Sequence, residues 1–509
     1  MKKILLLSFT ALTLLSSCGS LDINEDPNNP SDANVTADLI LPSAENYIAS
    51  TYGDLFFNYG GFFAQYFEQN PTANQYNKLT WYNFATDDNL TDRIYSNFYA
   101  GGLMDLKSLT GKTTNTADIY AATVLRAFAF QALVDLTGET PYSDALKGSN
   151  GQMPKYDQGK DVYLGVLREL DSVEALVKPE DAMACKDFIA GTSAGAWKGD
   201  VNRWKGFANA LRLRMYLRLI QGGVDASTYI QKVKDLVSKN EFFSGNITYD
   251  PGFKDEKSKR NPWYETNKSE LAPNHVAAMP IVSYMNATND PRIAYSFNTA
   301  TEGDAAGKYA GRIPGSHQEK TSWEKAHGSY DKIGYFSTLK YYTTAAVQLF
   351  TQAELQFLKA EVYAKYFNDD ASAKAAYEAG VRADFDTRSI SGADAFLAQS
   401  AVSWDAQGST DAKLKLVYMQ KWVALLYMDP FEAWSEQRRT NVPEWNATDG
   451  KGVDADPTTY TAGKLIYPFR NDMGNNVAPL RLFYSTSSIN LNKNCPKQPA
   501  LTTPVFWDK

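Results

Sequence analysis

The sequence predicts a mostly α-helical fold in which a scaffold of paired helices carries long irregular loops. Two observations support this prediction. Apolar residues recur with the period of a helix in several long stretches, of which residues 346–382 are the clearest. Between these stretches lie segments without that period, above all residues 240–340, which are rich in Asn, Gly, Pro and aromatic residues.

Residues 346–382 predict two helices joined by a short turn. In the first helix, Ala or Phe recurs every seven residues beside a polar stripe, and Asn-Asp-Asp at 368–370 ends the pattern. Asp370 or Ser372 is expected to cap the second helix by accepting an unpaired backbone N–H. The two helices combine small residues with one large aromatic residue, Tyr377, and this combination resembles a tetratricopeptide hairpin. An ordinary helical hairpin explains this stretch equally well.

Three other stretches also predict helices. Residues 120–136 are apolar on nearly all sides, which is typical of a helix buried between neighbours, and residues 161–177 are amphipathic. Residues 413–436 predict a helix that is interrupted at Asp429-Pro430, because proline cannot continue the hydrogen-bond ladder.

Residues 203–220 predict a helix with two apolar sides. Arg214 and Arg218 are four residues apart and therefore share one face. On a helix that is covered on two sides, we expect these arginines to be partly buried and paired with carboxylates, although a solvated basic face is the alternative.

The amino terminus predicts export and lipidation. Lys2 and Lys3 precede an apolar run at residues 4–15, which is too short for a stable transmembrane helix but typical of a secretory signal. The run ends in Leu-Ser-Ser before Cys18, which resembles a bacterial lipoprotein box with Cys18 as the lipidated first residue. Residues 19–34 are dense in Asp, Asn, Pro and Ser and predict an extended tether.

We therefore divide the chain into three parts: a lipoprotein signal peptide at 1–17, the lipidated Cys18 with a flexible tether at 18–35, and a single domain at 36–509. Within the domain, the irregular loop regions are expected at 69–84, 240–340 and 440–509.

Composition excludes several classes of protein. A net charge of −7 argues against a nucleic-acid partner, which would require a basic surface. No stretch after residue 18 is an unbroken apolar run long enough to span a bilayer. Cys185 and Cys495 could form one disulfide, but they are too isolated for a zinc site or a disulfide scaffold.

Catalytic motifs are absent or incomplete. Residues 191–195 match the nucleophile-elbow pattern G-x-S-x-G, but the residues before them make a poor strand and those after them a turn. Gly111-Lys112-Thr113 lacks the first glycine of a phosphate-binding loop, and no HExxH motif occurs. We expect no catalytic residue, no cofactor and no metal ligand.

A series of motifs resembles the SusD/RagB family, the nutrient-binding lipoproteins that serve SusC-type transporters in Bacteroidetes. Besides Cys18, the series consists of DINEDPNNP from Asp22, RAFAFQALVDLTGETPYSDAL from Arg126, RWKGFANALRLRM from Arg203, NDPRI from Asn289, AELQFLKAEVY from Ala353, QKWVALLYMDPFEAWSEQRRTNVP from Gln420, IYPF from Ile466 and a final VFWD. These motifs occur in the family's order and cover nearly the whole chain. The resemblance implies a SusD-like fold, in which tetratricopeptide-like helix pairs carry irregular ligand-binding loops.

The chain departs from the family pattern at two places. Thr137-Gly138-Glu139 stands where Tyr-Gly-Asp is usual, and Arg470 follows the Tyr-Pro stretch in place of an acidic residue. These departures leave the resemblance intact but weaken any transfer of ligand identity.

A glycan site requires aromatic faces for the C–H patches of sugar rings and polar groups for their hydroxyls. The loop regions supply both. Our candidate ligand-binding residues are Tyr76, Trp81 and Tyr82 with Asn74 and Asn83, and Trp263, Trp323 and Tyr330 with Arg312. For each aromatic residue taken alone, a place in the core or in a transporter contact is the alternative, so the hypothesis concerns the cluster.

The resemblance implies a protein anchored in the outer membrane at the cell surface by its lipid. It would capture an oligo- or polysaccharide and deliver it to a SusC-like TonB-dependent transporter, without chemistry of its own. The nearest alternative is a RagB-like protein that captures peptides. A surface glycoside hydrolase and a tetratricopeptide interaction protein without a small ligand are further alternatives.

Overall fold

The computed structural model describes residues 35–148, 153–189, 198–269, 273–319, 321–322 and 332–508. The predicted signal peptide, the lipidated Cys18 and the G-x-S-x-G match at 191–195 lie outside these residues. In the described part, helices dominate and strands are few and short, which confirms the predicted fold class.

The α-helices are α2 (Ala37–Thr51), α3 (Phe57–Phe63), α4 (Asn77–Thr80), α5 (Asp92–Tyr95), α6 (Met104–Lys112), α7 (Thr116–Thr137), α8 (Gly159–Glu174), α9 (Val201–Gln221), α10 (Ala226–Lys239), α11 (Pro262–Tyr264), α12 (Met279–Ala287), α13 (Ile293–Ser296), α15 (Gln352–Val362), α16 (Asp370–Thr387), α17 (Ala393–Leu397), α18 (Thr410–Leu425), α19 (Pro430–Thr440), α20 (Gly450–Ala455) and α21 (Thr486–Leu491). Short π-helical segments are η2 (Tyr52–Phe56), η3 (Ser96–Leu103), η5 (Glu265–Ser269) and η8 (Tyr363–Phe367), and 3-10 turns are η6 (Gly303–Ala305), η7 (Ile333–Tyr335), η9 (Trp404–Ala406) and η10 (Pro457–Thr459). The strands are β1 (Phe67–Gln69), β2 (Ile247–Tyr249), β3 (His275–Ala277) and β4 (Val347–Phe350).

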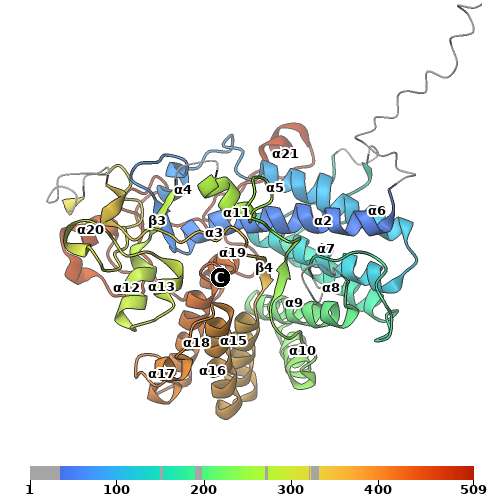
Figure 1. Ribbon diagram of the computed structural model, residues 1–509. Helices are drawn as coiled ribbons and strands as arrows, with labels where there is room; N and C mark the ends of the chain where they lie inside the picture. The colour runs from blue at the N-terminus through green and yellow to red at the C-terminus, as the bar shows by residue number, and fades with distance from the viewer. Residues whose placement is uncertain are drawn as a thin grey trace, which may run out of the picture.

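The scaffold consists of helices that pack in sequential pairs. α7 packs on α8, α9 on α10 and α15 on α16, and α18 completes a group with α15 and α16 that projects from the lower side of the molecule in Figure 1. These helices confirm the predictions for residues 120–136, 161–177 and 203–220. The predicted interruption at Asp429-Pro430 is confirmed as well, because α18 ends at Leu425 and α19 starts at Pro430.

Two details of the 346–382 hairpin differ from the prediction. Residues 347–350 form strand β4, paired with β2, and the helix starts only after Thr351, whose Oγ1 accepts from Glu354 N (3.0 Å). The second helix is capped by Asp369, whose Oδ1 accepts from Ser372 N (3.0 Å), and not by Asp370 or Ser372. Apolar periodicity marks which face of a segment is buried, but a tertiary strand partner and the local cap set where a helix begins.

The predicted burial and pairing of the α9 arginines is confirmed. Arg214 Nη2 donates to both oxygens of Glu354 (2.7 and 2.8 Å), and Arg218 joins Asp135 on α7 to Glu432 on α19. All of these side chains are buried. A network of buried ion pairs therefore links α7, α9, α15 and α19 inside the scaffold.

The carboxy-terminal segment enters the same core, and Figure 1 marks the C-terminus beside α19. Trp507 is fully buried, its Nε1 donates to Asp135 Oδ1 (2.7 Å), and its ring lies under the guanidinium groups of Arg218 and Arg438. The aromatic end of the sequence is therefore a core element.

Two small antiparallel sheets connect distant parts of the chain. β1 pairs with β3, with Glu68 opposite Val276, and β2 pairs with β4. The first sheet fastens the loop that follows β1 to the irregular region around residues 273–278. It thereby positions the functional surface described below.

Cys185 is buried and Cys495 half-buried, and both thiols are free, so the disulfide considered from the sequence does not form here. Among the described helices, α7 alone is long and apolar enough to cross a membrane by length and composition. Most of it is buried against its neighbours, which makes it the core helix that its sequence predicts.

Candidate functional site

A loop that leaves strand β1 carries most of the predicted glycan-binding residues. Its base is held by Gln69, whose Oε1 accepts from Tyr76 N (2.6 Å) and whose Nε2 donates to Asn274 O (2.9 Å). The loop then passes through α4 at residues 77–80. It is thus fixed to the segment that leads into β3.

Glu68 holds this loop against a second one. Its buried carboxylate accepts hydrogen bonds from Gln69 N (2.8 Å), Gly315 N (2.5 Å) and the Thr80 hydroxyl. Gly315 has φ +71°, and a Cβ there would lie 2.5 Å from Pro468 Cβ, so the turn requires glycine. The two predicted loop regions, 69–84 and 240–340, therefore meet at Glu68.

Replacing Glu68 by glutamine is expected to make stability less dependent on pH. Burial raises the pKa of this carboxyl from 4.5 to about 8. The folded protein then binds the proton more tightly than the unfolded chain, so stability falls as the pH rises from about 4.5 to about 8, by roughly 1.4 kcal/mol for each unit by which the pKa is raised. Glutamine cannot ionise, and the variant lacks this loss.

Thermal unfolding of the wild type and Glu68→Gln at about pH 5 and about pH 8 measures the difference. The wild type should lose more stability between the two values than the variant does. Glu180→Gln, at an exposed position, is the matched control. An equal loss in wild type and Glu68→Gln would show that Glu68 ionises without penalty.

Trp81 follows α4 and forms the centre of a surface that we call the Trp81 patch. Its Nε1 donates to His317 O (3.1 Å), and its ring stacks on the His317 imidazole with 5.9 Å between centroids. The Arg470 guanidinium lies over the indole, with Cζ 3.9 Å from the ring centroid, and leaves Trp81 9% exposed. The patch comprises Trp81, Asn74, Asn83, His317, Gln318, Arg470 and Asp472.

The rest of the patch offers polar groups at hydrogen-bonding distance from one another. Arg470 donates to both oxygens of Asp472 (3.0 and 2.9 Å), and Asn83 Nδ2 donates to the same carboxylate (2.6 Å). The hydrogen bond from Arg470 lowers the pKa of Asp472. Burial lowers the pKa of His317 to about 3, so the imidazole is neutral and Arg470 carries the positive charge of the patch.

A cleft is lined by residues 312, 313 and 316 of the same segment that carries His317 and Gln318, and we call it the Arg312 cleft. It has a volume of about 440 Å³, and Tyr335, Phe336 and Val453 of α20 line it together with Arg312. The Arg312 guanidinium is itself buried, donates from Nε to Ser316 Oγ (3.0 Å), and lies over the Phe336 ring. This volume falls within the roughly 300–1,000 Å³ typical of small-ligand pockets.

The remaining predicted ligand-binding residues do not belong to the Trp81 patch or to the Arg312 cleft. Tyr82 and Trp263 are buried, and Trp263 stacks on Tyr341 with 4.8 Å between centroids. Tyr76 is half-buried, and its hydroxyl donates to Asn267 Oδ1 (2.6 Å). Neither Tyr82 nor Trp263 presents a ring face to solvent. Trp323 and Tyr330 lie outside the described residues.

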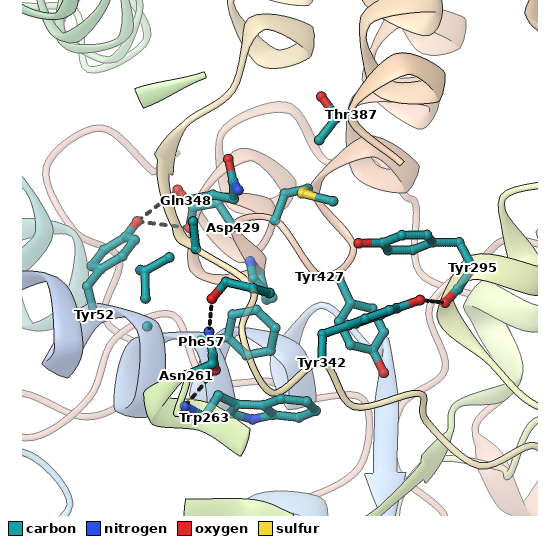
Figure 2. Close-up of a pocket in the computed structure, with 16 residues that line it drawn as sticks. Tyr52, Phe57, Asn261, Trp263, Tyr295, Tyr342, Gln348, Thr387, Tyr427 and Asp429 are labelled. Carbon is teal, nitrogen blue, oxygen red and sulfur yellow. Dashed lines mark hydrogen bonds between the residues drawn. The ribbon is translucent and has the colours of Figure 1, made fainter. Parts of the chain in front are cut away.

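An aromatic pocket inside the protein is too small for a sugar chain. Figure 2 shows Trp263, Tyr295, Tyr342 and Tyr427 around this pocket, with Asp429 at one side. Its volume is about 90 Å³, well below the roughly 300–1,000 Å³ of pockets that hold small ligands. In the described part of the chain, no group of three or more His, Cys, Asp or Glu side chains could hold a metal ion.

Comparison with known proteins identifies the family. Residues 27–468 match the model of the SusD-like family, which is described as "Starch-binding associating with outer membrane". The chain belongs to the SusD-like family. The family consists of binding proteins, not enzymes, and its description places them at the outer membrane.

Solved structures show the same fold as this SusD-like protein. A chitin-binding SusD homologue from Flavobacterium johnsoniae is 23% identical, with a TM-score of 0.72 over 92% of this chain and 97% of that one. A SusD homologue from Bacteroides thetaiotaomicron is 21% identical, with a TM-score of 0.71 over 93% and 99% of the two chains. One from Bacteroides vulgatus is 19% identical, with a TM-score of 0.72 over 92% and 97%. No curated protein sequence matches this chain.

Sequence reasoning missed four residues of the Trp81 patch in this SusD-like chain: His317, Gln318, Arg470 and Asp472. A signal was present for Arg470, because it departs from the acidic residue usual at that position in the family. The structure shows that this arginine covers the predicted Trp81 ring. His317 and Gln318 carry no local signal, because only the fold brings them to residue 74.

Proposed function

We propose that this SusD-like protein is a lipid-anchored protein of the cell surface that captures an oligo- or polysaccharide. It delivers the glycan to a SusC-like TonB-dependent transporter in the outer membrane. The observation that carries the proposal is the Trp81 patch, where three loop regions bring an aromatic ring together with amide, carboxylate and guanidinium groups. The starch-binding description of the family and the chitin-binding relative support a glycan as the ligand.

The patch suits the two kinds of contact that a sugar makes. The C–H face of a pyranose ring stacks on an indole, and its hydroxyls pair with amides and charged groups. Arg470 covers the Trp81 face and is paired with Asp472. A sugar ring therefore displaces the guanidinium from the indole, while Asp472 keeps Arg470 close enough to bind a hydroxyl.

Attachment to the membrane follows from Cys18 in this proposal. Two or more acyl chains on one cysteine give stable anchoring, and residues 19–35 act as the tether between lipid and protein body. The affinity for a long glycan arises from several modest contacts along one extended ligand.

Replacing Trp81 by alanine is expected to weaken glycan binding by up to about tenfold, because aromatic stacking contributes roughly 0.5–1.5 kcal/mol beyond burial. The measurement begins with affinity gels of residues 19–509 against starch, chitin, plant and host polysaccharides. Calorimetry with an oligosaccharide of the glycan that binds then gives Kd for each variant.

Tyr366→Ala is the matched control, because Tyr366 is a half-buried aromatic of η8, far along the chain from the patch. Trp81→Phe, which keeps a ring, should recover part of the affinity. An unchanged Kd in Trp81→Ala would remove Trp81 from the site. Failure to bind any glycan, together with binding of oligopeptides, would replace the proposal by peptide capture, and release of free sugars would indicate a hydrolase.

A further inference from the structure

A second cleft, distinct from the Trp81 patch, lies beside α2. It has a volume of about 600 Å³ and is bounded by α2, α5 and the segment from Tyr249 to Thr266. Its lining combines carboxylate, guanidinium, ammonium, amide and hydroxyl groups with the ring of Phe253. We call it the Arg93 cleft.

Three π-helical segments meet at this cleft. η2 supplies Asp54, η3 supplies Asn97, and η5 supplies Glu265 and Thr266. A π-helical turn adds a residue to a helix and redirects the side chains that follow. Such turns are rare in proteins overall, and those that occur are frequently at functional sites. The convergence of three of them on one cleft indicates that these polar side chains are held in place for a ligand.

Arg93 is the central group of the cleft, and a buried carboxylate positions it. Its Nη2 donates to Asp54 Oδ2 (2.7 Å), and the Thr266 hydroxyl donates to the same oxygen (3.2 Å). The Asp54 side chain is 5% exposed, whereas the Arg93 side chain is 61% exposed. Nε and Nη1 of Arg93 have no hydrogen-bond partner within the described residues, so these donor groups of a guanidinium held by Asp54 are available to a ligand.

Neutral polar groups continue the lining along α2. Asn46 Oδ1 accepts from the hydroxyls of Tyr249 (2.9 Å) and Ser50 (3.1 Å), and Asn97 Nδ2 donates to Thr51 Oγ1 (2.9 Å). Amides and hydroxyls whose orientation is already fixed are suited to the hydroxyl groups of a sugar ring.

The lining of the cleft contains more cations than carboxylates, although the protein as a whole carries a net charge of −7. Lys254, Lys259 and Arg260 line it together with Arg93, against the two carboxylates of Asp54 and Glu265. Surface acids outside the lining pair with two of these cations: Glu256 with Lys259 (2.6 Å) and Asp255 with Arg260 (2.7 Å). Arg260 also pairs with Glu265 within the lining (3.4 Å). Exposed pairs of this kind are weak and exchange readily with another anion.

We propose that the Arg93 cleft binds the anionic group of an acidic saccharide, a sugar carboxylate or sulfate, with Arg93 as its anchor. A guanidinium forms short, charge-assisted and often bidentate hydrogen bonds with such oxyanions. The neutral groups on α2 bind the hydroxyls of the same sugar, and Lys254 adds attraction at the rim. This inference rests on glycan capture as the proposed function and assigns the ligand class of one subsite.

The test compares acidic and neutral ligands on residues 19–509. Calorimetry is carried out with oligogalacturonate, with a chondroitin sulfate oligosaccharide and with a neutral chitin oligosaccharide. The variants are Arg93→Gln, the double variant Lys254→Gln/Lys259→Gln, and Arg382→Gln as the control. Arg382 is an exposed, ion-paired arginine on α16, and Figure 1 shows α16 well apart from α2 and α5, which bound the cleft.

At least one acidic ligand should bind, and Arg93→Gln should weaken that binding by roughly ten- to a hundredfold. The double lysine variant should reduce the dependence of Kd on salt, and Arg382→Gln should change nothing. The lysine variant also keeps the test decisive if Arg93→Gln does not fold, because its two exposed side chains are not part of the core. Oligogalacturonate carries carboxylates only, whereas chondroitin sulfate carries both carboxylates and sulfates. Binding of oligogalacturonate would therefore identify the carboxylate as sufficient, and binding of chondroitin sulfate without oligogalacturonate would indicate the sulfate.

Binding of the neutral oligosaccharide alone, sensitive to Trp81→Ala, would overturn this inference and leave the proposed function standing. An acidic ligand whose Kd is unchanged in both cleft variants would overturn it too. Binding of an acidic peptide but of no acidic sugar would replace the assigned ligand class. Absence of binding to every glycan would overturn the proposed function itself.

Discussion

Arg218→Met is expected to lower the free energy of unfolding by about 3–5 kcal/mol. Arg218 is fully buried on α9, with Nη1 2.5 Å from Asp135 Oδ2 and Nη2 2.7 Å from both oxygens of Glu432. Removing the cation leaves two carboxylates facing each other in the core. Burial already raises the pKa of Asp135, and loss of Arg218 would raise it further.

Urea denaturation at neutral pH measures the effect. Arg382→Met is the matched control, because it makes the same substitution at an arginine whose ion pairs are exposed. It should change stability by less than about 0.5 kcal/mol. Destabilisation of Arg218→Met should diminish at acidic pH, where the two carboxyls take up protons. A loss of stability no larger than in the control would mean that the network does not support the core.

Gly60→Ala is expected to lower the free energy of unfolding by about 3 kcal/mol or more. Gly60 lies in α3 where that helix meets the start of α19, and a Cβ would lie 2.3 Å from Phe431 N and 2.4 Å from Phe431 Cα. These are backbone atoms at a helix start, which cannot move as the end of a flexible side chain can. The methyl group that the substitution adds must therefore push α3 and α19 apart.

Gly111→Ala is the control for this variant, because Gly111 is helical in α6 and a Cβ there meets nothing within 4 Å. It should raise stability by up to about 1 kcal/mol, since alanine is the better helix former. Thermal or urea denaturation of both variants gives the comparison. Equal effects in the two variants would contradict the close contact at Gly60.

The helical scaffold could be predicted from the sequence because long apolar periods record which faces are buried. The α7 and α9 helices and the interruption at Pro430 follow from such patterns and from the chemistry of proline. Strand β4 could not be predicted in this way. Residues 347–350 continue the apolar pattern of the hairpin, and only pairing with β2, about a hundred residues upstream, makes them a strand.

The candidate site could be predicted in outline. The sequence indicated two loop regions as one functional surface, and the structure joins them through Glu68 and Trp81. It could not indicate which aromatic residues face outward. Trp81 and Trp263 both occur in polar, irregular segments, yet Trp263 packs against His275 and Tyr341 whereas Trp81 borders the surface. That difference is decided by the path of the backbone and not by the residue.

The buried partners of Asp135 lie far downstream in the chain and are therefore synthesised much later than Asp135 itself. Its cation Arg218 is synthesised 83 residues later, and the Trp507 indole that closes over it comes 372 residues later. Until Trp507 has been synthesised, the Asp135 carboxylate lacks one of its buried hydrogen-bond donors. The native core around Asp135 is therefore completed only when nearly the whole chain has been synthesised.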